Sequence, residues 1–510
     1  MLLLDAPRSA PLSFGVVKRI LDEIGVGTDT DDPSIAQSLR LLFPLDTDLA
    51  RRVRTGATSL TDAATSQEQI RFFQQRRADR SYITLAQAAA RRSGGLEVEI
   101  GRNSDIDASS RDFLRIASDV ARWRIRYRES SVEPVRRDAW MPEERRLLGL
   151  LELSALAEHL DEVCSAAFEY INVGDAATGV ALGRALARHE QSPRVWNLLA
   201  LGSAMLDRTE EAEFFYTRWS ESGGPLDSVR ALYGRAMLAA RHHQDGLRSI
   251  DRAGNLLDEA YAVIADLEDE QRMRDSTVFE EVFNRSGAAL VLFRRGRVKD
   301  ALELLEWGIA RLTQTSEKVA IHRSVLMYNL AQCRRQLGDG PGAIDAYERL
   351  LEVDPHMPEY HLEAAKCYAS ENRLEQAERS VRAALQLDDT LATAWSLLGV
   401  YLERRERHAD AADAFEEACR LEPRRAVHRL NQAYSLILSG ESGNARARLL
   451  GFEPSTVDEA ERHAALLAET CLRDGDYSAG ADVLEAALEM YPDSVSLAEN
   501  HKQVLARCPK

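Results

Sequence analysis

Two glycine-rich segments and one serine have the residue types, but not the spacing, that phosphate binding or nucleophilic catalysis requires. Gly25-Val26-Gly27 and Gly338-Asp339-Gly340 each contain a Gly-x-Gly step, but neither follows a strand and opens a helix as a phosphate-binding loop does. Ser203 follows Gly202 and lacks the second glycine of a nucleophile elbow. The sequence therefore predicts neither a nucleotide site nor a serine nucleophile at these positions.

A third segment begins like a calcium-binding loop. The residues from Asn103 to Asp107 alternate polar side chains in the way that such a loop does. Ala108 stands where the loop needs glycine, however, and Leu114 stands where it needs glutamate. We therefore expect Asp107 or Ser109 to cap a helix rather than to bind a metal ion.

The histidines and cysteines are also spaced unlike a metal site or a disulfide framework. The chain has 11 histidines and 6 cysteines, with no HExxH motif and no CxxC pair. His159 and Cys164 lie close together in the sequence, but no third or fourth ligand accompanies them. We expect no metal, no cofactor and no catalytic centre, so an enzyme is the least favoured class of protein.

Charge divides the chain into two parts. Residues 1–150 contain 24 Lys and Arg against 22 Asp and Glu, whereas the remaining residues contain 41 against 60. The acidic part should repel nucleic acid and anionic membranes, and it would suit a partner with a basic segment. Nucleic acid stays open as a partner of residues 1–150, because arginines gather between residues 66 and 137. They are Arg71, Arg76, Arg77, Arg80, Arg91, Arg92, Arg122, Arg124, Arg126 and Arg128.

No segment predicts secretion or membrane insertion. The N-terminus, from Met1 to Pro7, lacks the basic region of a signal peptide, and Asp5 interrupts its apolar run. No stretch reaches the roughly 20 apolar residues of a membrane-spanning helix. We therefore expect a cytoplasmic protein without a membrane-inserted segment.

A repeating unit organises most of the chain. Its clearest copy contains Trp395-x2-Leu398-Gly399-x2-Leu402, then Ala411-x3-Phe415-x2-Ala418 and Pro423. Steps of 34 residues in both directions keep the pattern of small and large side chains, and weaker copies extend it from about residue 150 to residue 492. The unit resembles the tetratricopeptide repeat (TPR), with Leu402 in place of the usual tyrosine. The resemblance implies an all-α, right-handed superhelical solenoid of about eight helix pairs.

Three parts follow from this register. Residues 151–493 form the TPR-like solenoid, and residues 494–510 fit a C-terminal capping helix, because the end of a repeat array needs a polar cover. Residues 1–150 form an N-terminal, mostly helical region of unknown role. In that region, alternation between glycines predicts a short strand over 94–101, and residues 21–33 predict a loop. Amphipathic spacing predicts helices over 34–43, 46–54, 66–79, 81–92 and 109–128.

The resemblance also implies where a partner binds. In tetratricopeptide folds the first helices of the pairs line a concave groove, and extended peptides or helices of partner proteins lie in it. Asparagine and tyrosine on that face could hydrogen-bond the backbone of an extended ligand and add apolar contact area. The register of Trp395 places these side chains on the face: Tyr328, Asn329, Gln332, Gln336, Glu363, Lys366, Ser396, Glu403, Asn431 and Tyr434.

The favoured function is therefore a scaffold or adaptor that binds a protein or peptide, and self-association through the end repeats is compatible with it. One alternative is a regulator whose arginine-rich N-terminal region binds nucleic acid while the repeats sense a partner. A second is an enzyme whose catalytic domain lies unrecognised in residues 1–150 and acts on clients delivered by the repeats. The partner and its pathway do not follow from the sequence.

Overall fold

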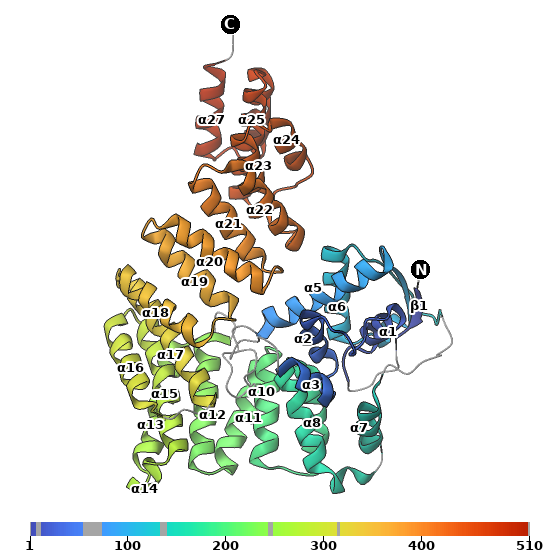
Figure 1. Ribbon diagram of the computed structural model, residues 1–510, viewed down its shortest axis with the longest axis vertical. Helices are drawn as coiled ribbons and strands as arrows, with labels where there is room; N and C mark the ends of the chain where they lie inside the picture. Colours follow the sequence, from blue (N-terminus) through green and yellow to red (C-terminus); the bar gives the residue numbers. More distant parts are fainter. Residues whose placement is uncertain are drawn as a thin grey trace. The chain divides into compact units, whose positions relative to one another are not determined.

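The chain folds into helices stacked in pairs, as Figure 1 shows. This computed structural model describes residues 2–6, 12–54, 74–132, 140–152, 154–242, 248–313 and 317–507. Two compact units make up the chain, Met1–Met357 and Pro358–Lys510. The predicted all-helical solenoid is confirmed, and a small sheet is added to it near the N-terminus.

The first unit begins with three short parallel strands. They are β1 (Leu2–Asp5), β2 (Glu97–Gly101) and β3 (Arg124–Tyr127), hydrogen-bonded in the order β1-β2-β3. Leu4, Val98 and Ile100 are buried on one face of this sheet. The accompanying helices are α1 (Gly15–Ile24), α2 (Pro33–Leu42), α3 (Thr47–Arg54), α5 (Gln74–Ser93), η2 (Asn103–Asp105), α6 (Ala108–Ala121), α7 (Pro142–Glu152) and η3 (Ser154–Glu158).

The strand predicted over 94–101 is confirmed by β2, whereas two other predictions need correction. The helix predicted over 109–128 ends at Ala121, because Arg122 takes a left-handed conformation with φ of 55° and the next residues enter the sheet as β3. The loop predicted over 21–33 begins only after Ile24, where Gly25 ends α1 with φ of 77°. Most of the helix predicted over 66–79 lies outside the described residues, and its last part belongs to α5.

Five helix pairs follow in the first unit. The second helix of each pair returns beside the first, so that the pairs stack along the chain. A short helix, α14 (Asp269–Arg272), precedes the fourth pair, and a π-helical turn, η4 (Leu238–His242), extends α12. The pairs are α8 (Leu160–Val173) with α9 (Ala176–Leu186), α10 (Pro193–Met205) with α11 (Thr209–Ser222), α12 (Pro225–Met237) with α13 (Ile250–Ala265), α15 (Asp275–Arg294) with α16 (Val298–Arg311), and α17 (Glu317–Gln336) with α18 (Gly340–Val353).

Four more pairs and a last single helix, α27 (Val495–Leu505), form the second unit. The described residues thus contain nine pairs in all, against about eight expected from the repeat pattern. Among the helices of the described ranges, none is both long and apolar enough to cross a membrane. The pairs of the second unit are α19 (Pro358–Ser370) with α20 (Leu374–Leu387), α21 (Ala392–Arg404) with α22 (His408–Leu421), α23 (Ala426–Leu438) with α24 (Ser442–Leu450), and α25 (Val457–Arg473) with α26 (Tyr477–Met490).

Small residues let the helices of a pair approach each other, as the repeat pattern predicts. A Cβ atom on Gly399 of α21 would lie 2.7 Å from the ring of Phe415 in α22. Phe415 is fully buried. The glycine and the phenylalanine of the repeat are therefore complementary shapes within one pair.

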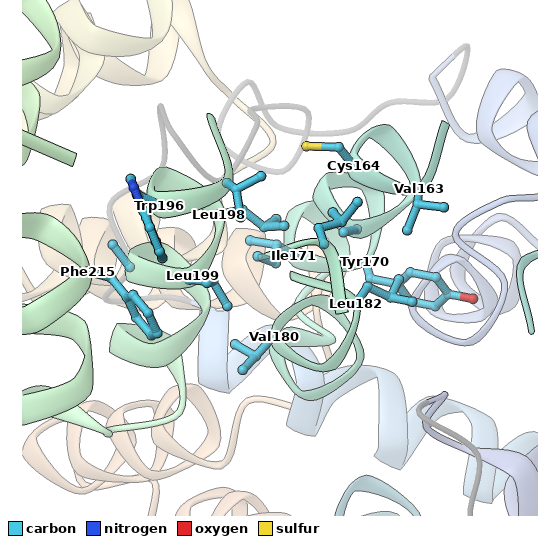
Figure 2. Packing of buried hydrophobic residues seen from close by; sticks show 14 of the residues in the cluster. Val163, Cys164, Tyr170, Ile171, Val180, Leu182, Trp196, Leu198, Leu199 and Phe215 are labelled. Carbon is cyan, nitrogen blue, oxygen red and sulfur yellow. The ribbon is translucent and has the colours of Figure 1, made fainter. Parts of the chain in front are cut away.

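The N-terminal region and the first pairs share one hydrophobic core. Trp196 and Phe215 stack with ring centroids 5.9 Å apart, and Figure 2 shows them beside Leu199 and the residues of α8 and α9. Leu12 and Leu147, from before the repeats, belong to the same buried cluster. Residues of the N-terminal region thus pack on the first helix pair at the end where a preceding repeat would otherwise pack.

Candidate protein-binding surface

Each first helix of the second unit leaves one stripe of its surface partly open. On α21, Thr393, Ser396, Leu397, Val400 and Glu403 are partly exposed at helical spacing, whereas the opposite side of the helix is buried. Corresponding stripes occur on the other three first helices. We call these residues the inner stripes; they are Glu359, Glu363, Lys366 and Ser370 on α19, the five residues of α21, Val427, Asn431, Tyr434 and Leu438 on α23, and Glu459, Arg462, His463, Leu466 and Glu469 on α25.

The structure therefore places the six predicted site residues of the second unit on the inner stripes. Lys366 Nζ donates to Glu363 Oε1 over 2.5 Å within α19. This ion pair neutralises one charge of each sign and leaves the ammonium with further N–H groups. Ser396 lies one turn before Val400 on the stripe of α21.

Hydrogen bonds join three successive first helices of the second unit. Ser435 of α23 donates through its hydroxyl to Glu403 of α21, and burial raises the pKa of Glu403 above its ordinary value. Arg462 of α25 donates from Nη2 to Asn431 Oδ1 of α23, with a distance of 2.9 Å. These contacts connect α21, α23 and α25 in the second unit, so their stripes form one continuous face there.

Tyr434 is the most exposed aromatic residue of this face. Its side chain stands on α23 one turn after Asn431 and is 45 % exposed. An exposed tyrosine offers a rigid apolar ring together with one hydroxyl group, and it orders few rotamers on contact. It is the residue of the inner stripes best suited to bury apolar area against a partner.

The four remaining predicted residues lie on α17 in the first unit. Gln332 Nε2 donates to Tyr347 Oη over 2.6 Å, and its side-chain oxygen accepts from Arg335 at 2.5 Å. Tyr328 contacts the same Tyr347 edge to face, with centroids 6.0 Å apart. Asn329 is partly buried and Gln336 is exposed. The side-chain amide of Gln332 thus forms hydrogen bonds within its own helix pair. It has fewer hydrogen-bonding groups available for a ligand than the repeat register alone suggested.

Sequence reasoning did not select Ser435 and Arg462, which each donate a hydrogen bond to the preceding first helix. Both act across successive repeats, at separations of 32 and 31 residues from their partners. These separations are slightly shorter than the repeat of 34, because the contacting residues sit at different heights on parallel first helices. Searching for polar pairs at that offset could have found them.

The arginines of the N-terminal region are partly paired with the sheet itself. Arg124 Nη1 donates to Glu97 Oε1 over 2.8 Å, and Arg128 pairs with Glu99. Arg92 donates to the carbonyl of Gly25. Arg71, Arg136 and Arg137 lie outside the described residues. A part of the arginine cluster therefore already has partners within the N-terminal region.

Titratable residues do cluster in the first unit, but the cluster is buried. Lys18 Nζ donates to Glu144 Oε1 over 2.5 Å, and Tyr170 donates to the same carboxylate at 3.0 Å. Asp175 accepts from the hydroxyls of Ser13 and Thr178 at 2.9 and 2.7 Å. Burial lowers the pKa of Lys18 and raises that of Asp175 to about 6.

This buried polar cluster joins α1, α7, α8 and α9. The side chains of Lys18 and Glu144 are only 2 and 1 % exposed, so no substrate can reach them without local unfolding. Each group finds its partner inside the cluster, as buried charges must. Its chemistry fits a structural connection between the N-terminal region and the first repeat.

The segment that begins like a calcium loop acts as a helix cap. Asp107 Oδ1 accepts from the backbone N–H of Ser110 at 2.8 Å and also from that of Phe14 at 3.1 Å. The predicted capping role of Asp107 is confirmed. In the part of the chain that the structure describes, no three His, Cys, Asp or Glu side chains are grouped as metal ligands would be.

The tetratricopeptide repeat family model matches residues 328–392 and 377–426. A TPR repeat-containing protein of Treponema pallidum (strain Nichols) is 29 % identical over 213 residues, which cover 35 % of this chain and 26 % of the relative. The chain thus spans about a quarter of the length of that curated relative.

Solved structures with a similar fold include the apo form of RapI and a tetratricopeptide repeat protein from Parabacteroides merdae. RapI is 12 % identical with a TM-score of 0.43, and the match covers 65 % of this chain and 96 % of RapI. The Parabacteroides protein is 15 % identical with a TM-score of 0.34, over 54 % of this chain and 99 % of the other. YrrB, described as a TPR protein with an unusual peptide-binding site, is 19 % identical with a TM-score of 0.28, over 39 and 88 %.

Stacked helix pairs with partly open inner stripes define a helical-repeat scaffold for protein interactions. The family match falls on the segment where the repeat pattern is clearest, from the second half of α17 to the start of α23. Residues 328–426 of the chain match tetratricopeptide repeats, and the resemblance inferred from Trp395, Gly399 and Phe415 is confirmed there.

Proposed function

We propose that this protein is an adaptor that binds an extended segment of a partner protein along the inner stripes of α19, α21, α23 and α25. The observation that carries the proposal is that hydrogen bonds from Ser435 to Glu403 and from Arg462 to Asn431 hold α21, α23 and α25 side by side, so that their exposed stripes adjoin. On α21 and α23 the stripes combine apolar residues, such as Leu397, Val400 and Tyr434, with polar ones. This mixture suits a partner that presents both apolar side chains and backbone polar groups.

The charge of the face selects the kind of partner. The inner stripes carry five carboxylates, on Glu359, Glu363, Glu403, Glu459 and Glu469, against the two cations of Lys366 and Arg462. The whole second unit holds 27 acidic and 18 basic residues. A segment with basic side chains near apolar ones would be attracted by this charge, and an acidic one would be repelled.

Affinity capture from the cell extract of the source organism tests the proposal. The intact chain is compared with a variant in which Lys366, Asn431 and Tyr434 are changed to alanine, and a stoichiometric protein partner should be lost from the variant. A matched control changes Gln386, Asp413 and Leu450, which are exposed on the second helices α20, α22 and α24, to alanine and should keep the partner.

The folded state of each variant is checked by thermal unfolding. Equal capture by the inner-stripe variant and the control would reject the inner stripes as the binding surface. Increased capture in high salt would reject a basic partner segment, because salt screens the attraction between exposed charges.

A further inference from the structure

The two edges of the N-terminal sheet differ in how their backbone groups are satisfied. At the edge formed by β1, Arg19 Nη1 donates to the carbonyl oxygen of Asp5 over 2.8 Å. The other edge is formed by β3. Within the ranges that the structure describes, no strand pairs with the outer side of β3.

The hydrogen bonds to β2 show which backbone groups of β3 face outward. Arg124 donates from its N–H to Leu96 O and Arg128 donates to Ile100 O, both at 2.8 Å. Successive residues of a strand direct their N–H and C=O groups to opposite edges. Ile125 and Tyr127, which alternate with the arginines, therefore present their backbone groups on the outer edge.

The side chains of β3 alternate in the same way. Arg124, Arg126 and Arg128 are exposed on the face of the sheet that also carries Glu97 and Glu99 of β2. Arg124 and Arg128 form ion pairs with those two glutamates. Arg126 lies between them, opposite Glu99 in register. In the described part of the chain, the ion pairs of this row of three arginines lie on its β2 side.

We propose that the outer edge of β3 binds an extended acidic segment of a partner protein as a fourth strand. Acidic residues at alternate positions of that segment would lie beside Arg124, Arg126 and Arg128. Cross-strand neighbours of opposite charge attract each other, and directly opposite like charges repel. Intervening apolar residues would lie beside Ile125 and Tyr127, and Tyr127 is 47 % exposed.

A second copy of this chain does not fit the same edge. Two-fold pairing of β3 with β3 would place one row of arginines against another. Pairing of β3 with the β1 edge of another copy would meet the carbonyl of Asp5 that Arg19 already occupies. The charge of the strand thus selects a different, acidic chain, and it sets this surface apart from the acidic inner stripes.

The chain itself supplies the pattern for a probe. On its inner side β3 pairs with β2, whose sequence around the strand is Gly95-Leu96-Glu97-Val98-Glu99-Ile100-Gly101. A fluorescently labelled peptide of this sequence would present alternating glutamates and apolar residues to the outer edge as well. A peptide with lysine in place of both glutamates is the matched control.

The test measures anisotropy of each peptide with the full-length protein, together with amide hydrogen exchange of residues 122–129. The glutamate peptide should bind at least tenfold more tightly than the lysine peptide and slow exchange in this segment. Arg126→Glu should reverse the preference between the peptides. Tyr127→Pro removes an outward N–H without removing a hydrogen bond to β2, and it should weaken binding at least tenfold.

Thermal unfolding of both variants separates loss of binding from loss of folding, and the reversed preference of Arg126→Glu cannot arise from unfolding. Absence of glutamate-peptide binding to the intact protein would overturn the proposal. The arginines would then serve to prevent edge-to-edge aggregation of the sheet. Binding of an oligonucleotide that depends on Arg126 without slower exchange at residues 122–129 would overturn it in favour of nucleic acid.

Discussion

Gly399 and Phe415 touch across the two helices of one repeat, with the site of a missing Cβ only 2.7 Å from the phenylalanine ring. Real Cβ atoms do not approach a ring so closely, so any larger side chain at residue 399 must displace the ring or separate the helices. The contact therefore sets the spacing between α21 and α22.

Substitution of Gly399 tests this relationship. Gly399→Val should lower the free energy of unfolding by about 2–3 kcal/mol, because overpacking outweighs the gain from removing glycine in a helix. Combining Gly399→Val with Phe415→Leu should cost less than the sum of the two single changes. Chemical denaturation of the four proteins measures the coupling, and simple additivity would show that the two side chains do not compete for space.

The turns between helices predict a stabilising change. Gly338, Asn372, Glu406 and Gly440 follow one another at intervals of 34 residues, and all have positive φ, with 60° at Glu406. A left-handed conformation costs an L-residue with a Cβ about 1–2 kcal/mol. Glycine avoids this steric cost, but it loses more conformational entropy on folding, which offsets part of the gain.

Glu406→Gly should therefore raise the free energy of unfolding by about 0.5–1 kcal/mol. Gly338→Ala should lower it by about 1 kcal/mol at the equivalent turn. Equilibrium unfolding in urea checks both. Destabilisation by Glu406→Gly would mean that the side chain of Glu406 makes a contribution that its exposed position does not account for.

Glu378 connects two repeats of the second unit through three arginines. It accepts from Arg382 at 3.0 Å and from Arg407 at 3.1 Å, and it also pairs with Arg405. Burial alone would raise the pKa of Glu378, but hydrogen bonds from Arg382 and Arg405 outweigh it, so the pKa lies below its ordinary value. The stabilisation is present above the unfolded-state pKa and is lost as the pH falls through the folded-state value.

Glu378→Gln should accordingly lower the free energy of unfolding at neutral pH by about 1–2 kcal/mol, a moderate value because the arginines are partly exposed. The difference from the unsubstituted protein should shrink in acid. Glu375→Gln is the matched control. Glu375 also pairs with Arg405 but is exposed, so this change should alter the free energy of unfolding little. Equal effects of both changes would contradict a special role for Glu378.

Asp175 should give the opposite pH dependence. Burial raises its pKa from 3.8 to about 6. Between these two pH values, Asp175 is therefore protonated in the folded state and ionised in the unfolded state. Stability due to this group therefore falls as the pH rises. Asp175→Asn is neutral at every pH, and the stability of the unsubstituted protein relative to this variant should drop by roughly 1–3 kcal/mol from about pH 4 to about pH 7. A relative stability that rises with pH would contradict it.

The repeat was predictable because local spacing encodes it. Trp395, Gly399 and Phe415 recur in register with other copies, and each helix pair needs only nearby residues to define its core. The left-handed turns at Asn372 and Glu406 could also have been located, since glycine stands 34 residues away at Gly338 and Gly440.

The N-terminal region was harder to predict, because distant contacts define it. Lys18 and Glu144 are separated by 126 residues, and neither has a neighbour in the sequence that indicates a partner. β3 was not predicted because Ile116, Trp123 and Tyr127 continue an apparent helical spacing. In the structure, the side chain of Trp123 instead donates from Nε1 to Ala86 O of α5, just before the chain enters the sheet. Tertiary contacts override the local pattern there.

The central claim, that a partner lies on the inner stripes, is tested most directly by site-specific photo-crosslinking. A photoreactive phenylalanine derivative replaces Tyr434 on α23 in one protein and Leu450 on the second helix α24 in another, both exposed positions. We expect a single crosslinked partner from residue 434 and none from residue 450. Crosslinking from residue 450 alone, or to the same extent from both, would contradict binding on the inner stripes.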